Sequence, residues 1–224
     1  FTLSFILIKA LYLYFCSETE YFSMDKFNVE KEILDTSELE RLFLREGIFT
    51  TIKRNEYLIR QNEMTNQIGF VVSGIFRLSR IDVNGNEWII GYSFKNDFVC
   101  DYPSFINKMG ATVNIQASTD CEVYLLSLNR LNQFWETDMN TQRLGRRIAE
   151  TMFAEIYQRL LGFYCDTPEQ RYQALMKRCP DLQGKLSLKE IAHFLGITPE
   201  TLSRIRKKII FLVNQDSVSS RLDS

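Results

Sequence analysis

The sequence has little of what most metal and disulfide sites need. Its 224 residues include one histidine, His193, and five cysteines. The cysteines are Cys16, Cys100, Cys121, Cys165 and Cys179. Their odd number and the lack of a Cys-x-x-Cys pair exclude a disulfide framework, a zinc cluster and an iron–sulfur cluster. We therefore expect isolated thiols in a reducing compartment.

The scarcity of histidine also argues against an enzyme. A metal site of the cupin type, inside a β-barrel, would need several ligands that this sequence does not offer. His193 lies in a helical segment near the C-terminus, and we expect it at the surface or beside a phosphate. We predict no catalytic residue, no metal and no cofactor.

A strong net charge is missing as well. The formal charge of −1 excludes a uniformly basic coat of the kind that binds nucleic acid. The positive charge is local, because residues 171–208 hold nine Lys or Arg against three Asp or Glu. The composition, 45% hydrophobic and 25% charged, is typical of a soluble protein with one large or two modest domains.

The one long apolar run is at the start, where thirteen of residues 1–16 are apolar. Sixteen helical residues span roughly 24 Å, less than the ~30 Å hydrocarbon core of a bilayer. A basic start and a small-residue cleavage site are both missing, so the run does not have the pattern of a signal peptide. We expect residues 1–23, ahead of Met24, to be a non-native or disordered extension. A membrane anchor is the alternative.

Residues from Asp25 to about Leu128 have the pattern of a β-domain. Short amphipathic helices are expected from Asp25 to Arg45, with apolar residues at helical spacing: Ile33, Leu34, Leu39, Leu42 and Phe43. The runs "EYLIRQNE", "IGFVVSGIFRLSRI", "EWIIGYSF", "TVNIQAST" and "CEVYLLSL" are rich in β-formers and separated by turn residues. Asn84-Gly85 predicts a type I′ hairpin turn. Five or more strands at this spacing predict a sandwich or small barrel.

From Asn129 to Tyr164 the spacing is helical. On a helical wheel Ile148, Met152, Ile156 and Phe163 cluster on one side, with Phe153, Tyr157, Leu160 and Tyr164 beside them. This apolar surface covers about half of the circumference, wider than the ~100° stripe that one contact needs. We expect the helix to pack on its own barrel and on a partner helix.

"CDTPEQ" breaks the pattern. Thr167, Pro168 and Gln170 predict a capped helix start, with a domain boundary near Asp166. "LSLKEIAHFLGITPETLSRIRKK" then predicts two helices and a tight turn. Ser187 with Glu190 caps the first helix, Ala192 allows close helix crossing, Gly196 ends the helix in a left-handed conformation, and Thr198 and Pro199 begin the second. Leu202 and Ile205 should face Ile191, Leu195 and Ile197.

This pattern predicts a helix-turn-helix whose second helix can lie in the DNA major groove. Glu200, Thr201, Ser203, Arg204, Lys207 and Lys208 remain for its outer face. An Arg there can bridge guanine O6 and N7, and a Glu can accept from cytosine N4. Backbone contacts are expected from Ser187, Lys189, Thr198, Thr201, Arg206, Lys207 and Lys208.

A barrel, a long helix and a helix-turn-helix containing "ETLSR" resemble the Crp–Fnr family of bacterial transcription regulators over residues 25–210. The resemblance implies an α+β fold: a double-stranded β-helix of jelly-roll type at residues 24–137, a dimerisation helix at 138–165 and a DNA-binding domain at 166–224. It implies a cytoplasmic homodimer on palindromic double-stranded DNA, contacting RNA polymerase if it activates, with no membrane role. Glu200 and Arg204 match the family's base-reading acid and arginine, and Ser203 matches a further base contact. Pro199 stands where many members have another arginine, and "FLVNQDSVSSRLDS" lacks the pattern of the usual β-hairpin wing.

The resemblance also places an effector pocket, for which the candidates are Cys100, Asp101, Tyr102, Pro103, Ser104, Ala111 and Thr112. Cyclic-nucleotide-binding members have Gly-Glu for the ribose hydroxyl, where Cys100-Asp101 stands here. They have Arg-Ser or Arg-Thr for the phosphate, where Ala111-Thr112 stands. We therefore expect an effector other than cyclic AMP. A nucleotide-sensing module that acts through protein partners without binding DNA is the alternative function.

Overall fold

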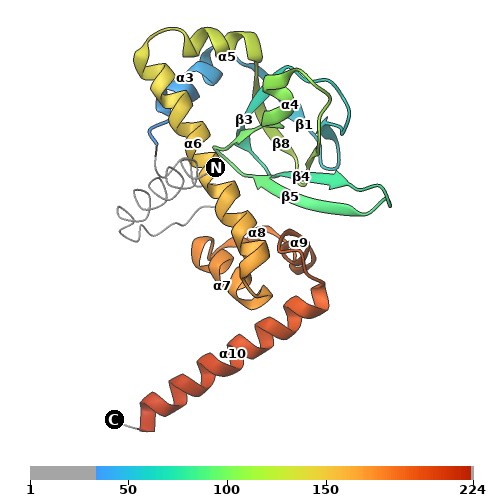
Figure 1. Cartoon of the computed structure of the whole chain (residues 1–224), viewed down its shortest axis with the longest axis vertical. Coiled ribbons are helices and arrows are strands. Elements are labelled where there is room, and N and C mark those ends of the chain that lie inside the picture. Colours follow the sequence, from blue (N-terminus) through green and yellow to red (C-terminus); the bar gives the residue numbers. More distant parts are fainter. Residues whose placement is uncertain (1–33, 223–224) are drawn as a thin grey trace, which may run out of the picture.

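The computed structural model describes residues 34–222, with side chains described as far as Ile210. The extension predicted at residues 1–23 lies outside this range. Figure 1 shows a β-barrel, a long helix α6 beside it, and short helices followed by a second long helix, α10. Within the described range, no helix is both long and apolar enough to cross a bilayer.

Two four-stranded antiparallel sheets form the barrel, in the orders β1-β8-β3-β6 and β2-β7-β4-β5. The strands are β1 (Ile48–Ile52), β2 (Tyr57–Ile59), β3 (Gln67–Ser73), β4 (Phe76–Ile81), β5 (Glu87–Ser93), β6 (Phe98–Val99), β7 (Asn114–Ala117) and β8 (Cys121–Ser127). Val71 and Val123 of one sheet pack with Phe76 and Ile115 of the other, and all four are buried. The α+β prediction, with a β-domain followed by a long helix and C-terminal helices, is confirmed.

Each of the five predicted segments contains a strand, and two further strands were missed. β1 and β6 were not predicted, and the run of residues 68–81 is two strands joined at Gly74. Gly74 has φ +91°, and a Cβ there would lie 2.5 Å from the Asp120 carbonyl oxygen and from the Cys121 Sγ. Only glycine satisfies both the conformation and the close approach.

The predicted hairpin between β4 and β5 is present, but the predicted turn type is wrong. Gly85 has a positive φ, +83°, whereas Asn84 does not, so the turn is not type I′. The Asp82 carboxylate organises the turn instead: it accepts the N–H of Asn84 (2.8 Å), the N–H of Asn86 (2.9 Å) and Nε1 of Trp88 (3.0 Å). These hydrogen bonds, chiefly that from Trp88, lower the pKa of Asp82 to about 2.

A β-bulge interrupts the pairing of β4 with β5. Leu78 pairs with Gly91 and Ser79 pairs with Ile89, which leaves Ile90 as an extra residue on β5. Ile89 and Tyr92, three residues apart, are therefore both buried against the C-terminal helices.

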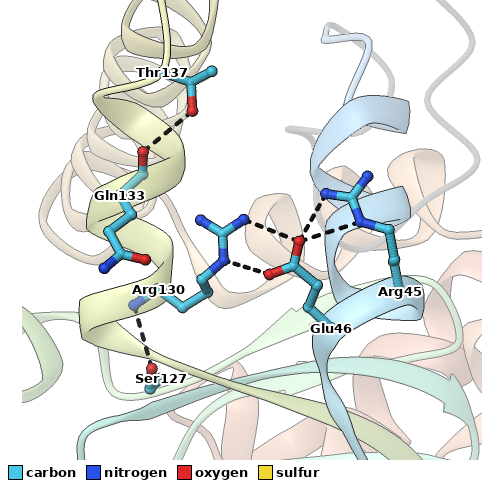
Figure 2. Close-up of polar contacts among 6 residues, drawn as sticks. All are labelled: Arg45, Glu46, Ser127, Arg130, Gln133 and Thr137. Carbon is cyan, nitrogen blue, oxygen red and sulfur yellow. Dashed lines mark hydrogen bonds and ion pairs between the residues drawn. The ribbon is translucent and has the colours of Figure 1, made fainter.

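Helix α3 (Ser37–Glu46) closes one end of the barrel against α5 (Leu128–Trp135), and buries Leu39, Leu42 and Phe43 as its spacing predicts. Figure 2 shows the polar contact between the two helices. Glu46 accepts from both Nε and Nη2 of Arg130, the latter at 2.9 Å, and from Arg45 Nη2 at 2.8 Å. These bonds, with Arg130 dominant, hold the pKa of Glu46 down at about 2.

The helix predicted to run from Asn129 to Tyr164 is in fact two helices, α5 and α6 (Met139–Cys165). Asp138 starts the second one, because its carboxylate accepts the N–H groups of Asn140 (2.7 Å) and Thr141 (2.9 Å). The remaining helices are α7 (Pro168–Arg178), α8 (Leu182–Lys185), α9 (Leu188–Phe194) and α10 (Pro199–Leu222). The predicted capping box of Thr167 and Gln170 at the start of α7 is confirmed.

Candidate nucleic-acid interface

The turn between α9 and α10 is built by the residues that the sequence singles out. The Ser187 hydroxyl accepts the Glu190 N–H (3.3 Å), and the Glu190 carboxylate accepts the Ser187 N–H (2.9 Å). Gly196 ends the segment with φ +67°, which a β-carbon would disfavour. The first helix of the motif is thus fixed at both ends by local chemistry.

Helix α10 begins at Pro199 under the Thr198 hydroxyl, which accepts the Thr201 N–H at 3.2 Å. Leu202 is fully buried and Ile205 nearly so, in a cluster with Ile191 and Leu195 of the preceding helix and turn. Partly buried Ile197 packs against the same cluster. This apolar contact sets the crossing of α9 and α10, and it turns the opposite face of α10 to solvent.

Three polar side chains lie on that solvent face, close to the start of the helix. Glu200, Ser203 and Arg204 are exposed, and their i, i+3 and i+4 spacing puts them side by side. Hydrogen bonds from the backbone N–H of Glu200 itself and from Thr198 lower the pKa of the Glu200 carboxyl, so it is ionised at neutral pH. The face therefore offers a carboxylate acceptor beside a guanidinium donor.

The predicted backbone-contact residues fall into two groups. Lys189 and Lys207 are exposed cations. Arg206 instead donates to Gln183 (3.1 Å), Lys208 donates to Glu169 (2.7 Å), and the Thr201 hydroxyl lies 3.1 Å from that of Thr198. Ser187 and Thr198 act as helix caps. Part of the expected cationic surface therefore also joins α10 to α7 and α8.

The helix-turn-helix shares its core with the barrel, which the sequence did not predict. Ile89 and Tyr92 of β5 are buried in one cluster with Phe194, Leu195 and Leu202. No spacing rule links a strand to a helix a hundred residues later, so the contact leaves no signal in the sequence.

Arg159 of α6 packs against one side of this shared core. Its guanidinium lies 4.0 Å from the ring centroid of Phe194 and donates to the Ile90 carbonyl oxygen. Burial, helped by the charge of Arg178, lowers the pKa of Arg159 to about 10. Arg178 also pairs with Glu155 of α6 at 3.0 Å. Strand β5, α6 and the motif are thus joined at one point.

The segment for which no β-hairpin wing is expected continues as helix: α10 runs as one helix to Leu222. Figure 1 shows α10 extending away from the other C-terminal helices. The motif therefore ends in a long helix and not in a β-hairpin wing.

The candidate dimer residues on α6 do not share one environment. Ile148 packs against the core below α3 and α5, and Met152 is half-buried. Ile156 is 65% exposed, whereas Phe163 is 42% exposed and lies under Arg159 and Arg171. The structure thus divides the predicted set between the chain's own core and solvent.

The candidate effector residues lie in α4 (Tyr102–Asn107) and on either side of it in the chain. Asp101, Ser104 and Ala111 are buried, with Asp101 5% exposed and Ala111 1% exposed. Burial, with the Asp101 charge adding to it, raises the pKa of the Cys100 thiol to about 12. The structure therefore brings these residues together, but turns several of them inward.

Two cavities lie nearby, and none of the candidate effector residues lines either. One, of about 560 Å³, is an open groove between the loop at Met64, the Lys108 side chain and the start of α5. The other, of about 20 Å³, lies between Ile59, Gly69 and Leu125 inside the barrel and has room for about one water.

Comparison with known proteins agrees with this architecture. Residues 49–138 match the model of the cyclic nucleotide-binding domain. The CRP-like protein Clp of Xanthomonas campestris pv. campestris is 22% identical over 193 residues, which cover 79% of this chain and 83% of that protein.

Two solved structures have the same fold. FixK2 from Bradyrhizobium japonicum aligns with a TM-score of 0.63 at 18% identity, over 74% of this chain and 85% of that one. The global regulator CLP of Xanthomonas campestris aligns with a TM-score of 0.59 at 19% identity, over 78% and 91%. The resemblance seen in the sequence is confirmed: the chain has a cyclic nucleotide-binding domain within the fold of the Crp–Fnr regulators.

Proposed function

We propose that the chain is a transcription regulator that binds a specific DNA sequence as a homodimer in the cytoplasm. The observation that carries the proposal is the outer face of α10, where exposed Glu200, Ser203 and Arg204 lie at the start of a doubly capped helix-turn-helix. Relatives named as CRP-like proteins and a global regulator support the same function.

In this proposal the start of α10 enters the major groove. Arg204 donates to O6 and N7 of a guanine, Glu200 accepts from N4 of a cytosine, and Ser203 makes a further base contact. The exposed cation Lys207 lies further along the helix and suits a phosphate, which fixes position but not sequence. A carboxylate close to DNA phosphates is unfavourable unless it gains a hydrogen bond. Glu200 therefore contacts a base and not the phosphate backbone.

The homodimer is supported by the exposed side of α6. Phe153, Ile156, Leu160 and Tyr164 are between 48% and 82% exposed and recur at three- and four-residue spacing. Tyr157 lies in the same stripe and stacks on Phe153 with ring centroids 6.1 Å apart. A continuous apolar stripe of this kind on a helix is the signature of a helix–helix interface. Two copies joined along it would present two α10 helices to half-sites about 34 Å apart.

The test is a set of binding isotherms on a selected site and on every single-base variant of it, at two salt concentrations. Arg204→Ala should cost about 1 to 3 kcal/mol and relax preference at one position of each half-site. The matched control is Lys207→Ala, which should weaken binding to all variants alike and reduce the salt slope by about one unit. If both changes weaken binding to all variants equally, α10 binds DNA through its charge alone and does not read the sequence.

Failure of the native chain to bind a DNA column at low salt would favour the alternative, a module that acts through protein partners. The effector is a separate question. Because Ala111 supplies no guanidinium and is buried, we expect calorimetry to find no micromolar binding of cyclic AMP. Micromolar affinity would contradict this part of the proposal and leave the DNA-binding part standing.

A further inference from the structure

Three donors converge on one oxygen of the buried Asp101 side chain. Oδ2 accepts the Ser104 hydroxyl at 2.6 Å, the Thr112 hydroxyl at 2.8 Å and, through a short hydrogen bond, the Thr112 backbone N–H. Ser104 is fully buried and Asp101 nearly so. A distance of 2.6 Å is typical of a hydroxyl that donates to a carboxylate.

The charge of this carboxylate is balanced by dipoles and not by a cation. Over residues 34–210, where side chains are described, no Lys or Arg forms an ion pair with Asp101. A buried charge without a cation is costly unless several hydrogen bonds stabilise its ionised form. Ser104 and Thr112 supply those hydrogen bonds here, and Asp101 Oδ2 is the acceptor that they share.

The same contacts tie together two ends of a loop. Asp101 precedes α4, and Thr112 follows Asp101 by eleven positions in the chain, just ahead of β7. The neighbouring residue Ala111 is held to the loop after β2 by hydrogen bonds with Asn62 (2.7 Å) and Glu63 (2.8 Å). Asp101 therefore closes α4 onto a segment that is already fixed.

A backbone N–H and two hydroxyls that point to one place are what an oxyanion ligand requires. We propose that Asp101 is a built-in ligand of the barrel: its carboxylate occupies an anion site formed by Ser104 and Thr112, so this part of the domain is filled without a small-molecule effector. Removing the side chain should then open a site for a small carboxylate anion from solution. The inference concerns the barrel alone and goes beyond the proposed DNA-binding function.

The experiment is thermal unfolding of the full chain in formate and in chloride at matched ionic strength. Asp101→Ala should lower the Tm by roughly 5 °C or more, because the Thr112 N–H and hydroxyl lose their acceptor, whereas Ser104 keeps the Gly110 carbonyl oxygen at 3.2 Å. Formate should then raise the Tm of this variant, in a saturable manner, by more than it raises that of the native chain. Adding Thr112→Val should abolish the formate effect, because a donor of the site is lost.

The matched control is Asp120→Ala, which removes an exposed carboxylate from the turn before β8 that accepts from Lys53 and from the Arg54 N–H. Its Tm should respond to formate as the native chain does. An equal formate response in Asp101→Ala and Asp120→Ala would overturn the proposal.

If Asp101→Ala does not fold, the isosteric Asp101→Asn decides. The charged acceptor makes the stronger hydrogen bond, so amide exchange at Thr112 should be about threefold faster or more in this variant. An unchanged exchange rate would overturn the proposal. None of these measurements uses DNA, so their failure is distinct from a failure of the proposed function.

Discussion

Helices α6 and α10 are the two longest in the described chain, with 27 and 24 residues, and they expose opposite kinds of side chain. On α6 only Thr141 is buried, and large apolar groups such as Phe153 and Ile156 face solvent. The start of α10 buries its apolar groups, Leu202 and Ile205, and exposes Glu200 and Arg204. An exposed apolar face is typical of a protein–protein contact, whereas a polar face on a helix that is anchored by two buried residues is available to a polar ligand.

The largest expected effect comes from making the α6 face polar. Ile156→Glu with Leu160→Glu should give monomers in analytical ultracentrifugation, because charges would be buried at the interface. DNA affinity should fall by on the order of 100-fold or more, since the two half-sites would no longer be bound together.

The matched control for the α6 change is Arg146→Glu with Arg143→Glu, which adds the same number of acidic groups to the same helix, outside the apolar stripe. It should leave the dimer intact. A dimer of unchanged affinity in the Ile156, Leu160 double variant would mean that the apolar stripe has another partner.

A second effect, intermediate in size, concerns the outer face of α10 that we propose to contact the bases. Glu200→Ala should loosen discrimination at one position of each half-site by about 1 to 3 kcal/mol, and should not lower affinity for random DNA. Competition assays with specific and random duplexes at one salt concentration would measure it. Loss of affinity for both duplexes would assign Glu200 a structural role through its Thr198 contact.

The contact of α6 with α9 and β5 comes next, and its loss should affect stability and not the discrimination between DNA sequences. Arg159→Ala removes the stacking on Phe194 and the hydrogen bond to the Ile90 carbonyl oxygen. We expect the free energy of unfolding to fall by about 1 to 3 kcal/mol, or roughly 2 to 10 °C in Tm.

Arg146→Ala is the control for Arg159→Ala, because its 3.5 Å pair with Glu150 is exposed and should contribute about 0.5 kcal/mol or less. Calorimetric unfolding of both variants would compare them. Equal Tm values in the two variants would show that Arg159 does not stabilise the contact between α6 and the motif.

The smallest effect concerns Glu46, a charge that stabilises the fold and lies outside the face of α10 proposed to bind DNA. Glu46, between Arg130 and Arg45, has a pKa of about 2 in the folded chain, against an ordinary value of 4.5. The stability that it contributes is complete above about pH 4.5 and is lost as the pH falls toward 2. Tm measured against pH should therefore fall less steeply over this window in Glu46→Gln than in the native chain. Parallel curves would show that the contact in Figure 2 adds nothing to stability.

Local chemistry explains what the sequence predicted. The caps at Thr167, Ser187 and Thr198 and the left-handed Gly196 follow from residue types that act on their own neighbours. The buried positions of α9 and α10 follow from helical spacing. Such features need no knowledge of the rest of the chain.

The features that were missed depend on distant partners. Strand β1 has a mostly exposed edge, and β8 supplies its pairing; β6 has only two residues, paired with β3. Asp101 is visible in the sequence as a substitution at a pocket position. Its role as an internal acceptor depends on Thr112, which only the folded loop brings within 2.8 Å.

The extra residue on β5 has a consequence for how the chain tolerates change in length. Because Ile90 is bulged, one strand presents Ser93 to the barrel side and both Ile89 and Tyr92 to the C-terminal helices. Deleting Ile90 would leave Ile89 and Tyr92 two positions apart, and regular alternation would keep both on the same face of the strand. A single-codon deletion at this point would therefore keep the apolar contact with the C-terminal helices and remove the Ile90 carbonyl oxygen that accepts from Arg159, while leaving every side chain proposed to touch DNA in place.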